Sequence, residues 1–409
     1  MANHQNFWFG TCPTKHIVSS GLVRNADVLI IGGGIAGISL LYQLLIGGIS
    51  NTYLVEESTV ASRASGRSSG QLMFRGAKLF SEMPEEDGIE YLKCIAENNR
   101  RFLHGFRNVG FDTDLKNNGG LRLAIDDAEL EKLKLESSFI LKHINIDCPI
   151  LSKQEIQNLL PGSNFVGGMF VPNESTFNPY KLVNGLRELI EQKGSRVLTD
   201  AQVTQVVPNA DGTLSVSIRH KGIIRAKKVV YCTNAYTSEL LPEFTDKAVS
   251  FRGQMIATEV LPEIIMQLIP NMSMTCNDCN EYFRVHNDRL LVGGMRQSIR
   301  GQQTGIINDG EISPVIYDKL RSFINEAMPF LKDTKFNYTW SGIMCSTLDG
   351  MPIVGPLLNR PNEYVLAGFN GYGFSHALCG SMIIKDFILK GSSQLHGARL
   401  FDPSRFTDK

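Results

Sequence analysis

The sequence predicts an α/β fold made of two interwoven domains, and three observations lead to this prediction. Residues 27–55 have the pattern of a buried strand, a glycine-rich turn, a helix and a second strand, which is typical of a parallel βαβ unit. Residues 250–300 are rich in alternating strand segments, which indicates a separate antiparallel sheet. The chain has no repeat and no low-complexity linker, so the domains are expected to exchange segments rather than follow one another.

Length and composition limit the possible classes of protein. The 409 residues are 43% hydrophobic and 20% charged, which is ample for a large core and excludes a disordered or fibrous protein. At roughly 100–200 residues per domain, two or three domains are expected. Lys and Arg (41) balance Asp and Glu (41), which argues against a general nucleic-acid binder or a binder of anionic membranes.

The cysteines and the N-terminus bear on the cellular compartment. The 8 cysteines are scattered through a long chain, unlike those of a secreted disulfide scaffold, and residues 1–10 lack the basic and apolar regions of a signal peptide. We therefore expect a cytoplasmic protein with reduced thiols. Residues 28–55 carry no charge and are long enough to span a bilayer, but glycines divide them into strand, turn and helix. No integral membrane span is therefore expected.

The βαβ unit is the first group of elements. Residues 27–31 are an apolar run typical of a parallel strand that is buried on both faces. A glycine-rich turn at residues 32–37 leads into a helix expected over residues 38–46, which further glycines end. Residues 52–55 form the second strand.

Later elements carry equally clear signals. Ser152 and Glu155 form a capping box at the start of a short helix, and Asn178 with Pro179 starts an amphipathic one. Strands are expected at residues 196–199, 203–207, 214–219, 228–232, 254–260, 290–292 and 364–369. The last strand leads through a glycine-rich turn into a helix that Gly391 ends.

The turn after the first strand carries a dinucleotide-binding fingerprint. Gly32 permits the tight turn, Gly34 lets the main chain approach a pyrophosphate, and Gly37 allows the helix to pack closely on the strand. The N-terminus of the helix offers unpaired N–H groups to the phosphates. Glu56, at the end of the second strand, can accept hydrogen bonds from a ribose and disfavours the 2′-phosphate of NADP. This unit alone leaves FAD and NAD open, within a Rossmann-like domain.

A resemblance to a known family decides between the two. Residues 64–71 (ASGRSSGQ) resemble the second motif of the D-amino-acid oxidase (DAO) family of FAD-dependent oxidoreductases, which includes glycine oxidase, sarcosine oxidase and γ-glutamylputrescine oxidase. Further stretches are similar to this family: residues 229–236, 252–254, 340–342, 349–356 and 368–374. The chain is most similar to the γ-glutamylputrescine oxidase branch, which the preamble Phe7-Trp8 also resembles.

The resemblance implies a bound FAD. Because Gly342 stands where some sarcosine oxidases carry a cysteine that attaches FAD, a non-covalent FAD is expected. Residues 65–69 would line its ribityl and pyrophosphate, Val203 its adenine and residues 370–375 its ring, with the helix near Phe374 directed at N1 and C2=O. The residues assigned to FAD are Gly32, Gly34, Ile35, Ala36, Gly37, Glu56, Glu57, Ser65, Gly66, Arg67, Ser68, Ser69, Gly70, Gln71, Val203, Asn234, Gly342, Asn370, Gly371, Tyr372, Gly373, Phe374 and Ser375.

The resemblance also implies a division into domains. A FAD-binding domain would comprise residues 25–95, 166–245 and 337–395, and a smaller α+β substrate domain would comprise residues 96–165 and 246–336. An N-terminal extension (1–24) and a C-terminal tail (396–409) would flank them.

The reaction that the resemblance implies is oxidation of the CH–NH bond of an amine or amino acid. A hydride would pass to flavin N5, the imine would hydrolyse, and O2 (giving H2O2) or another acceptor would reoxidise the flavin. Sarcosine oxidases carry an oxygen-activating lysine in the strand that matches residues 289–293, and this strand has none inside it. A dehydrogenase therefore remains open beside an oxidase.

Candidates for the substrate side are Tyr282, Arg284, Trp340 and Tyr372. Arg284 could pair with a substrate carboxylate or serve in a structural ion pair. His286 and His376 are expected to be structural, as is Cys345.

Other hypotheses remain open beside this one. The chain could be a flavin-binding sensor with little turnover or an oxidoreductase that modifies tRNA, although its neutral charge argues against a nucleic-acid partner. Cys276 and Cys279 have the spacing of a zinc half-site, but no second pair accompanies them, so no metal is expected. The small-molecule substrate, the electron acceptor and the oligomeric state are left open.

Overall fold

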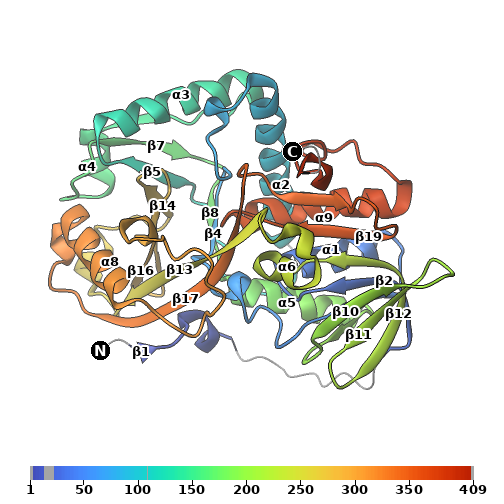
Figure 1. Ribbon diagram of the computed structural model, residues 1–409. Helices are drawn as coiled ribbons and strands as arrows, with labels where there is room; N and C mark the ends of the chain where they lie inside the picture. The colour runs from blue at the N-terminus through green and yellow to red at the C-terminus, as the bar shows by residue number, and fades with distance from the viewer. Residues whose placement is uncertain (1–2, 13–22, 108, 407–409) are drawn as a thin grey trace.

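Two large β-sheets organise the computed structural model, which describes residues 3–12, 23–107 and 109–406 (Figure 1). The first sheet has a parallel core whose strands run β9-β3-β2-β12-β19, extended by antiparallel neighbours. Its strands are β2 (Asn25–Ile31), β3 (Thr52–Val55), β9 (Arg196–Leu198), β10 (Val203–Pro208), β11 (Leu214–Ile218), β12 (Gly222–Tyr231), β18 (Ile353–Pro356) and β19 (Glu363–Ala367).

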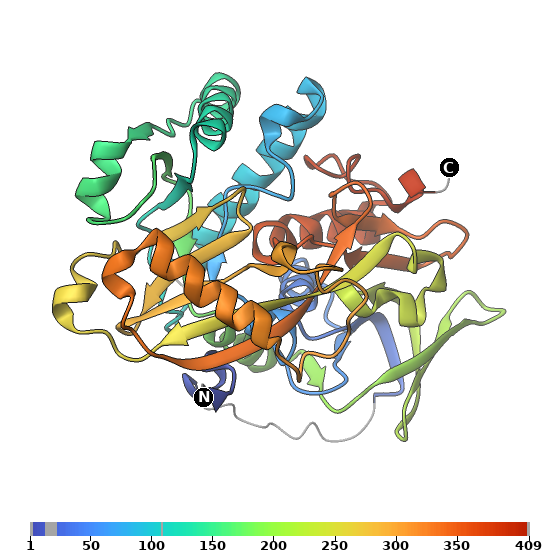
Figure 2. The ribbon, with the colours of Figure 1, turned by 60° about the vertical axis from the view of Figure 1, so that its left-hand side comes forward.

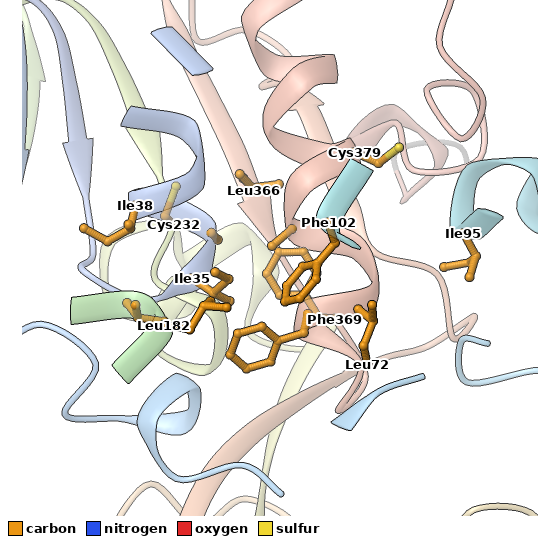
Figure 3. Close-up of a cluster of buried hydrophobic side chains, with 14 of the residues drawn as sticks. Ile35, Ile38, Leu72, Ile95, Phe102, Leu182, Cys232, Leu366, Phe369 and Cys379 are labelled. Carbon is orange, nitrogen blue, oxygen red and sulfur yellow. The ribbon is translucent and has the colours of Figure 1, made fainter. Parts of the chain in front are cut away.

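Helices cover the first sheet on the side of Val28 and Ile30. The covering helices are α1 (Ile35–Ile46), α5 (Pro179–Gln192) and α9 (Gly373–Lys390). Figure 3 shows side chains of α1, α5 and α9 in one buried cluster with Leu366 of β19. The alternate residues Leu29 and Ile31 join a different cluster on the other face, so β2 is buried on both faces as predicted.

The second sheet is mainly antiparallel and runs β1-β17-β13-β16-β15-β14-β5-β7-β6. Its strands are β1 (Asn3–His4), β5 (Gly120–Ala124), β6 (Ile150–Ser152), β7 (Gly167–Val171), β13 (Ala248–Thr258), β14 (Ser273–Cys276), β15 (Glu281–His286), β16 (Arg289–Gly293) and β17 (Phe336–Thr347). One face packs against the apolar side of α8 (Pro314–Ala327), which crosses in front of the sheet in Figure 2. The predicted second, antiparallel sheet is thus present.

Further elements connect or flank the two sheets. They are α2 (Glu85–Arg107), α3 (Asp127–Ile144), α4 (Lys153–Leu159), α6 (Thr237–Leu240), α7 (Glu263–Met266) and the short pair β4 (Gln71–Leu72) and β8 (Ser175–Thr176). Within the described ranges, no helix combines the length and the apolar character that crossing a bilayer requires.

Short local sequence motifs account for most boundaries of the expected helices and strands. The capping box is present: the Ser152 hydroxyl accepts from the main chain of Glu155, whose carboxylate accepts from the main chain of Ser152. The first helix begins at Ile35, before the expected residue 38, because Gly34 takes the extended N-cap conformation. The predicted domain boundary after residue 95 falls inside α2, and the division into domains stays a prediction.

Glycine at position 37 determines how closely α1 approaches β2. A Cβ atom at Gly37 would lie 2.0 Å from the carbonyl oxygen of Gly32, so alanine there must push the helix off the strand. We expect Gly37→Ala to lower the free energy of unfolding by about 1–3 kcal/mol and to weaken FAD binding. Gly105→Ala is the matched control: Gly105 lies exposed in α2 with nothing near its would-be Cβ, so it should gain about 0.5–1 kcal/mol. Urea unfolding of the two variants measures both values, and equal effects would contradict the steric argument.

Candidate active site

A long cavity lies at the carboxyl ends of the parallel strands β2 and β3, where open α/β sheets bind their ligands. Its empty volume, including the mouth, is about 1430 Å³. Predicted FAD residues in its wall are Gly32, Gly34, Ile35, Ala36, Glu56, Glu57, Ser65, Arg67, Ser68, Val203, Asn234, Gly342, Gly371, Gly373 and Phe374. We call this the first cavity.

The glycine turn forms the floor of the first cavity. Gly32 has φ +112°, and a Cβ there would lie 2.6 Å from the carbonyl oxygen of Cys232. The N–H of Ile35 donates to the Ser65 hydroxyl (2.9 Å), while the other N–H groups of the first turn of α1 have no intrahelical acceptor. Gly37 lies behind this turn and does not line the cavity, in keeping with its predicted packing role.

Two glutamates, Glu56 and Glu57, follow directly after β3. The buried Glu56 carboxylate accepts from the N–H groups of Gly33 (2.7 Å) and Ser58 (2.9 Å). Burial raises its pKa, and these two hydrogen bonds partly offset the effect. Glu57 pairs with Arg63 at 2.8 Å, and the Arg63 guanidinium also pairs with Asp309.

The second motif, residues 64–71, lines part of the first cavity and part of a neighbouring one. Ser68 lines both, whereas Ser69 and Gln71 line only the neighbour. Gly66 and Gly70 line neither cavity: a Cβ on Gly66 would lie 2.0 Å from the Ala61 carbonyl oxygen, and Gly70 has φ +68°. These two positions shape the main chain.

The neighbouring cavity, which we call the second cavity, opens beside the first. The two share Ser68, Gly253, Tyr282, Met344, Gly371 and Phe374, so they join at these residues. The predicted flavin loop divides between them, since Asn370, Tyr372 and Ser375 line only the second cavity and Gly373 only the first. The empty volume of the second cavity, including its open mouth, is about 940 Å³.

Arg296, Tyr282 and Tyr372 give the second cavity its chemistry. Arg296 is the one formally charged side chain in the described wall of this cavity. Its guanidinium carbon stacks 4.1 Å from the Phe251 ring centroid, and burial lowers its pKa. Burial raises the pKa of Tyr282 to about 12 and also raises that of Tyr372, so both phenols are neutral at physiological pH. The sequence analysis does not identify Arg296, whose signal is an arginine two residues after the Gly293–Gly294 pair at the end of a strand.

The other two predicted substrate-side residues lie elsewhere. Trp340 lines the first cavity, and its indole N–H donates to the carbonyl oxygen of Arg67 (2.8 Å). Arg284 lines neither cavity, because its guanidinium donates to the main-chain carbonyls of Gly70 (2.6 Å) and Phe177 (2.8 Å). The structure therefore brings Tyr282 and Tyr372 to the second cavity but not Arg284.

Three cysteines and His376 of α9 lie in or near the cavity walls or in the buried interior. Cys279 lines the second cavity with its sulfur 3.2 Å from the Arg75 guanidinium, and Cys276 is buried beneath. Cys345 is buried and lines neither cavity. His376 is buried between the Tyr91 hydroxyl (2.8 Å) and the Tyr372 carbonyl oxygen (2.7 Å). Its ring therefore contacts the predicted flavin loop at Tyr372.

The first cavity fits an adenine dinucleotide. Its wall begins at the start of β10, passes the glycine turn and the unpaired N–H groups of α1, and ends at the second cavity. At Gly342 the atom nearest to a would-be Cβ is in the Arg67 side chain at 3.3 Å, and no cysteine stands there to form a covalent link.

Comparison with known proteins gives consistent matches. Residues 27–386 match the family model described as FAD dependent oxidoreductase (DAO). The chain is 24% identical over 405 residues to gamma-glutamylputrescine oxidoreductase of Escherichia coli (strain K12), covering 96% of this chain and 91% of that protein. It is 24% identical to mitochondrial dimethylglycine dehydrogenase of Mus musculus, covering 93% of this chain but 44% of that protein.

Two solved structures share the fold. L-proline dehydrogenase from P. horikoshii superimposes with a TM-score of 0.80 at 19% identity, covering 94% of this chain and 99% of that chain. Glycine oxidase from Geobacillus kaustophilus gives a TM-score of 0.80 at 18% identity, with the same coverage of 94% and 99%.

The buried His376 predicts an acid-sensitive stability. Burial lowers its pKa to about 4, so the folded chain binds fewer protons here than the unfolded chain between about pH 6.5 and pH 4. Stability is then fully present above pH 6.5 and falls by about 2–3 kcal/mol towards pH 4. We expect His376→Gln to flatten this loss in urea unfolding at pH 7.5 and 4.5. The exposed His104→Gln in α2 serves as the control, and an unchanged slope in His376→Gln would contradict the assignment.

Proposed function

The chain belongs to the family of FAD dependent oxidoreductases (DAO), and on that premise we propose that it oxidises the CH–NH bond of an amino acid or an N-substituted amino acid. Its predicted family, fold class and cofactor, FAD, are confirmed by the family match and the shared fold. The named relatives include amine and amino-acid oxidoreductases. The substrate class and the roles of single residues are proposals.

Arg296 carries the proposal for the substrate. Its guanidinium is a positive charge in the wall of the second cavity, and no Asp or Glu lines the described part of that wall. A carboxylate can take two parallel hydrogen bonds from such a guanidinium, whereas a cationic polyamine would gain no counter-charge there. This arrangement supports a substrate with a carboxylate near its reactive amine.

Tyr282 and Tyr372 complete the proposed binding site. Because their pKa values are raised, both phenols keep their protons and can donate to an anionic substrate group. Tyr282 also lines the first cavity, so its side chain stands where substrate and cofactor would meet. The two tyrosines and Arg296 would fix the orientation of the substrate, which is the main contribution of the protein in such a reaction.

The described wall of the second cavity contains no His, Lys, Asp or Glu that could act as a general base. The substrate amine must therefore enter unprotonated or release its proton to water. Bound FAD supplies the acceptor for the hydrogen and electron pair that leave the substrate carbon. Met73, Phe251 and Met344 form an apolar part of the wall, which would limit water around the reacting bond once a substrate fills the cavity. Hydrolysis of the imine then gives an oxo acid and an amine.

An anaerobic titration tests the function. The purified protein is loaded with FAD and mixed, without oxygen, with a panel of amino acids, N-methyl amino acids, amines and polyamines. Bleaching of the flavin band by a carboxylate-bearing compound supports the proposal, and bleaching by polyamines alone contradicts it. Readmitted air then separates oxidase from dehydrogenase through the rate of recolouring and the yield of H2O2.

Removing the charge of Arg296 is expected to weaken substrate binding. With an amino-acid substrate, Arg296→Met should raise KM by about 10- to 100-fold, as expected for the loss of a charge-assisted hydrogen-bonded pair worth about 1.5–3 kcal/mol. Arg300→Met removes the same charge from an exposed position in the same loop and should leave KM unchanged. Steady-state kinetics measures both. Equal KM values for the two variants would rule out the carboxylate contact.

A further inference from the structure

The N-terminal segment is part of the site rather than a separate extension. Strand β1 runs parallel to β17, with Asn3 opposite Tyr338, and the 3-10 helix Phe7–Gly10 follows at once (Figure 1). Trp8 is completely buried and Phe7 nearly so. The Phe7 ring lies between the two tryptophans of the chain, with its centroid 5.1 Å from Trp8 and 6.4 Å from Trp340.

Side chains from distant parts of the chain hold the carbonyl oxygens of the second motif. Asn6 donates to the carbonyl of Gly66 (2.9 Å). The indoles of Trp340 and Trp8 donate to those of the next two residues, Arg67 (2.8 Å) and Ser68 (2.7 Å). The Arg284 guanidinium donates to that of Gly70 (2.6 Å) and lies 5.8 Å from the Trp8 ring. We call these four donors the carbonyl clamp.

The clamp also fixes where the neighbouring N–H groups point. All described peptide bonds are trans, so each N–H points away from the carbonyl of the preceding residue. With the carbonyls of Arg67 and Ser68 held by the indoles, the N–H groups of Ser68 and Ser69 are turned to the opposite side. Among the described residues neither N–H has an acceptor, and both serines line the second cavity, Ser68 the first as well.

We propose that Trp8 is a positioning residue for FAD, acting through the peptide group between Ser68 and Ser69. The indole of Trp8 fixes and polarises this group, so that the Ser69 N–H, with that of Ser68, is preorganised to donate to the bound cofactor where the two cavities join. A main-chain N–H favours negative charge, which grows on the flavin when it is reduced. Trp8 should therefore favour reduced FAD more than oxidised FAD.

Trp8→Phe tests this role, because phenylalanine keeps most of the packing and loses the N–H donor. The apoprotein is titrated with FAD, and the quenching of the fluorescence of the remaining tryptophan, Trp340, gives the Kd. The midpoint potential of the bound flavin is then measured against redox dyes. We expect Kd for FAD to rise about fivefold to tenfold, as for one lost hydrogen bond, and the potential to become more negative. A purely structural role would loosen both redox states alike and leave the potential unchanged.

Thr11→Val is the matched control. The Thr11 hydroxyl donates to the Trp8 carbonyl at the end of the same 3-10 helix and accepts from Asn178, and it makes no hydrogen bond to residues 66–70. It should lower the melting temperature of the apoprotein without changing the potential. The proposal is overturned if Trp8→Phe keeps the wild-type potential, or if Thr11→Val shifts it equally.

A second variant tests the carbonyl clamp in case Trp8→Phe does not fold. Asn6→Asp keeps the side-chain oxygen that caps Trp8 and removes the donor to the Gly66 carbonyl, so it should also weaken FAD binding. If both Trp8→Phe and Asn6→Asp bind FAD like the wild type, the clamp does not contribute and the proposal fails. Neither measurement uses a substrate, so the result stands apart from the outcome of the proposed function.

Discussion

The orientation of the peptide groups in residues 66–70 is the constraint on which the site depends. The carbonyl oxygens of this stretch take their donors from the N-terminal segment, from β17 and from β15. A buried donor without an acceptor costs about 1–3 kcal/mol, so each of these contacts stabilises both the loop and the element that contacts it. The main chain that lines the two cavities is therefore held to the second sheet and to the N-terminal segment.

The parts that the sequence predicts well are those fixed by neighbours in the chain. The apolar run of β2, the glycine turn and the capping box at Ser152 each depend on residues a few positions apart. The packing role of Gly37 follows from its spacing to Gly32, and the 2.0 Å approach in the structure has that cause. The long helices α2, α3 and α8 are not among the predicted elements, although Asp126 caps the start of α3 and Ser313 caps the start of α8.

Long-range hydrogen bonds explain why residue type alone leads to a wrong assignment for Arg284. Arg284 was assigned to the substrate because a guanidinium suits a carboxylate, but carbonyl oxygens of Gly70 and Phe177 take its donors. Both lie more than a hundred positions away in sequence, so no local pattern could reveal them. Arg296 shows the reverse case: the closeness of Phe251 from β13 brings its charge to the cavity wall. The role of Phe7 and Trp8 was likewise hidden, because their partners are separated from them by much of the chain.

Residues that line both cavities limit how substrate specificity can change without affecting the cofactor site. Ser68, Tyr282 and Met344 line both cavities, so a substitution at any of them alters the walls of the proposed cofactor and substrate sites together. Gly294, Arg296 and Gln297 line only the second cavity and belong to one loop after β16. Loops tolerate substitution better than the packed elements they connect. Under the proposed function, the loop after β16 could change the substrate that is bound while the carbonyl clamp and the first cavity stay as they are, which would separate substrate choice from cofactor binding within one continuous site.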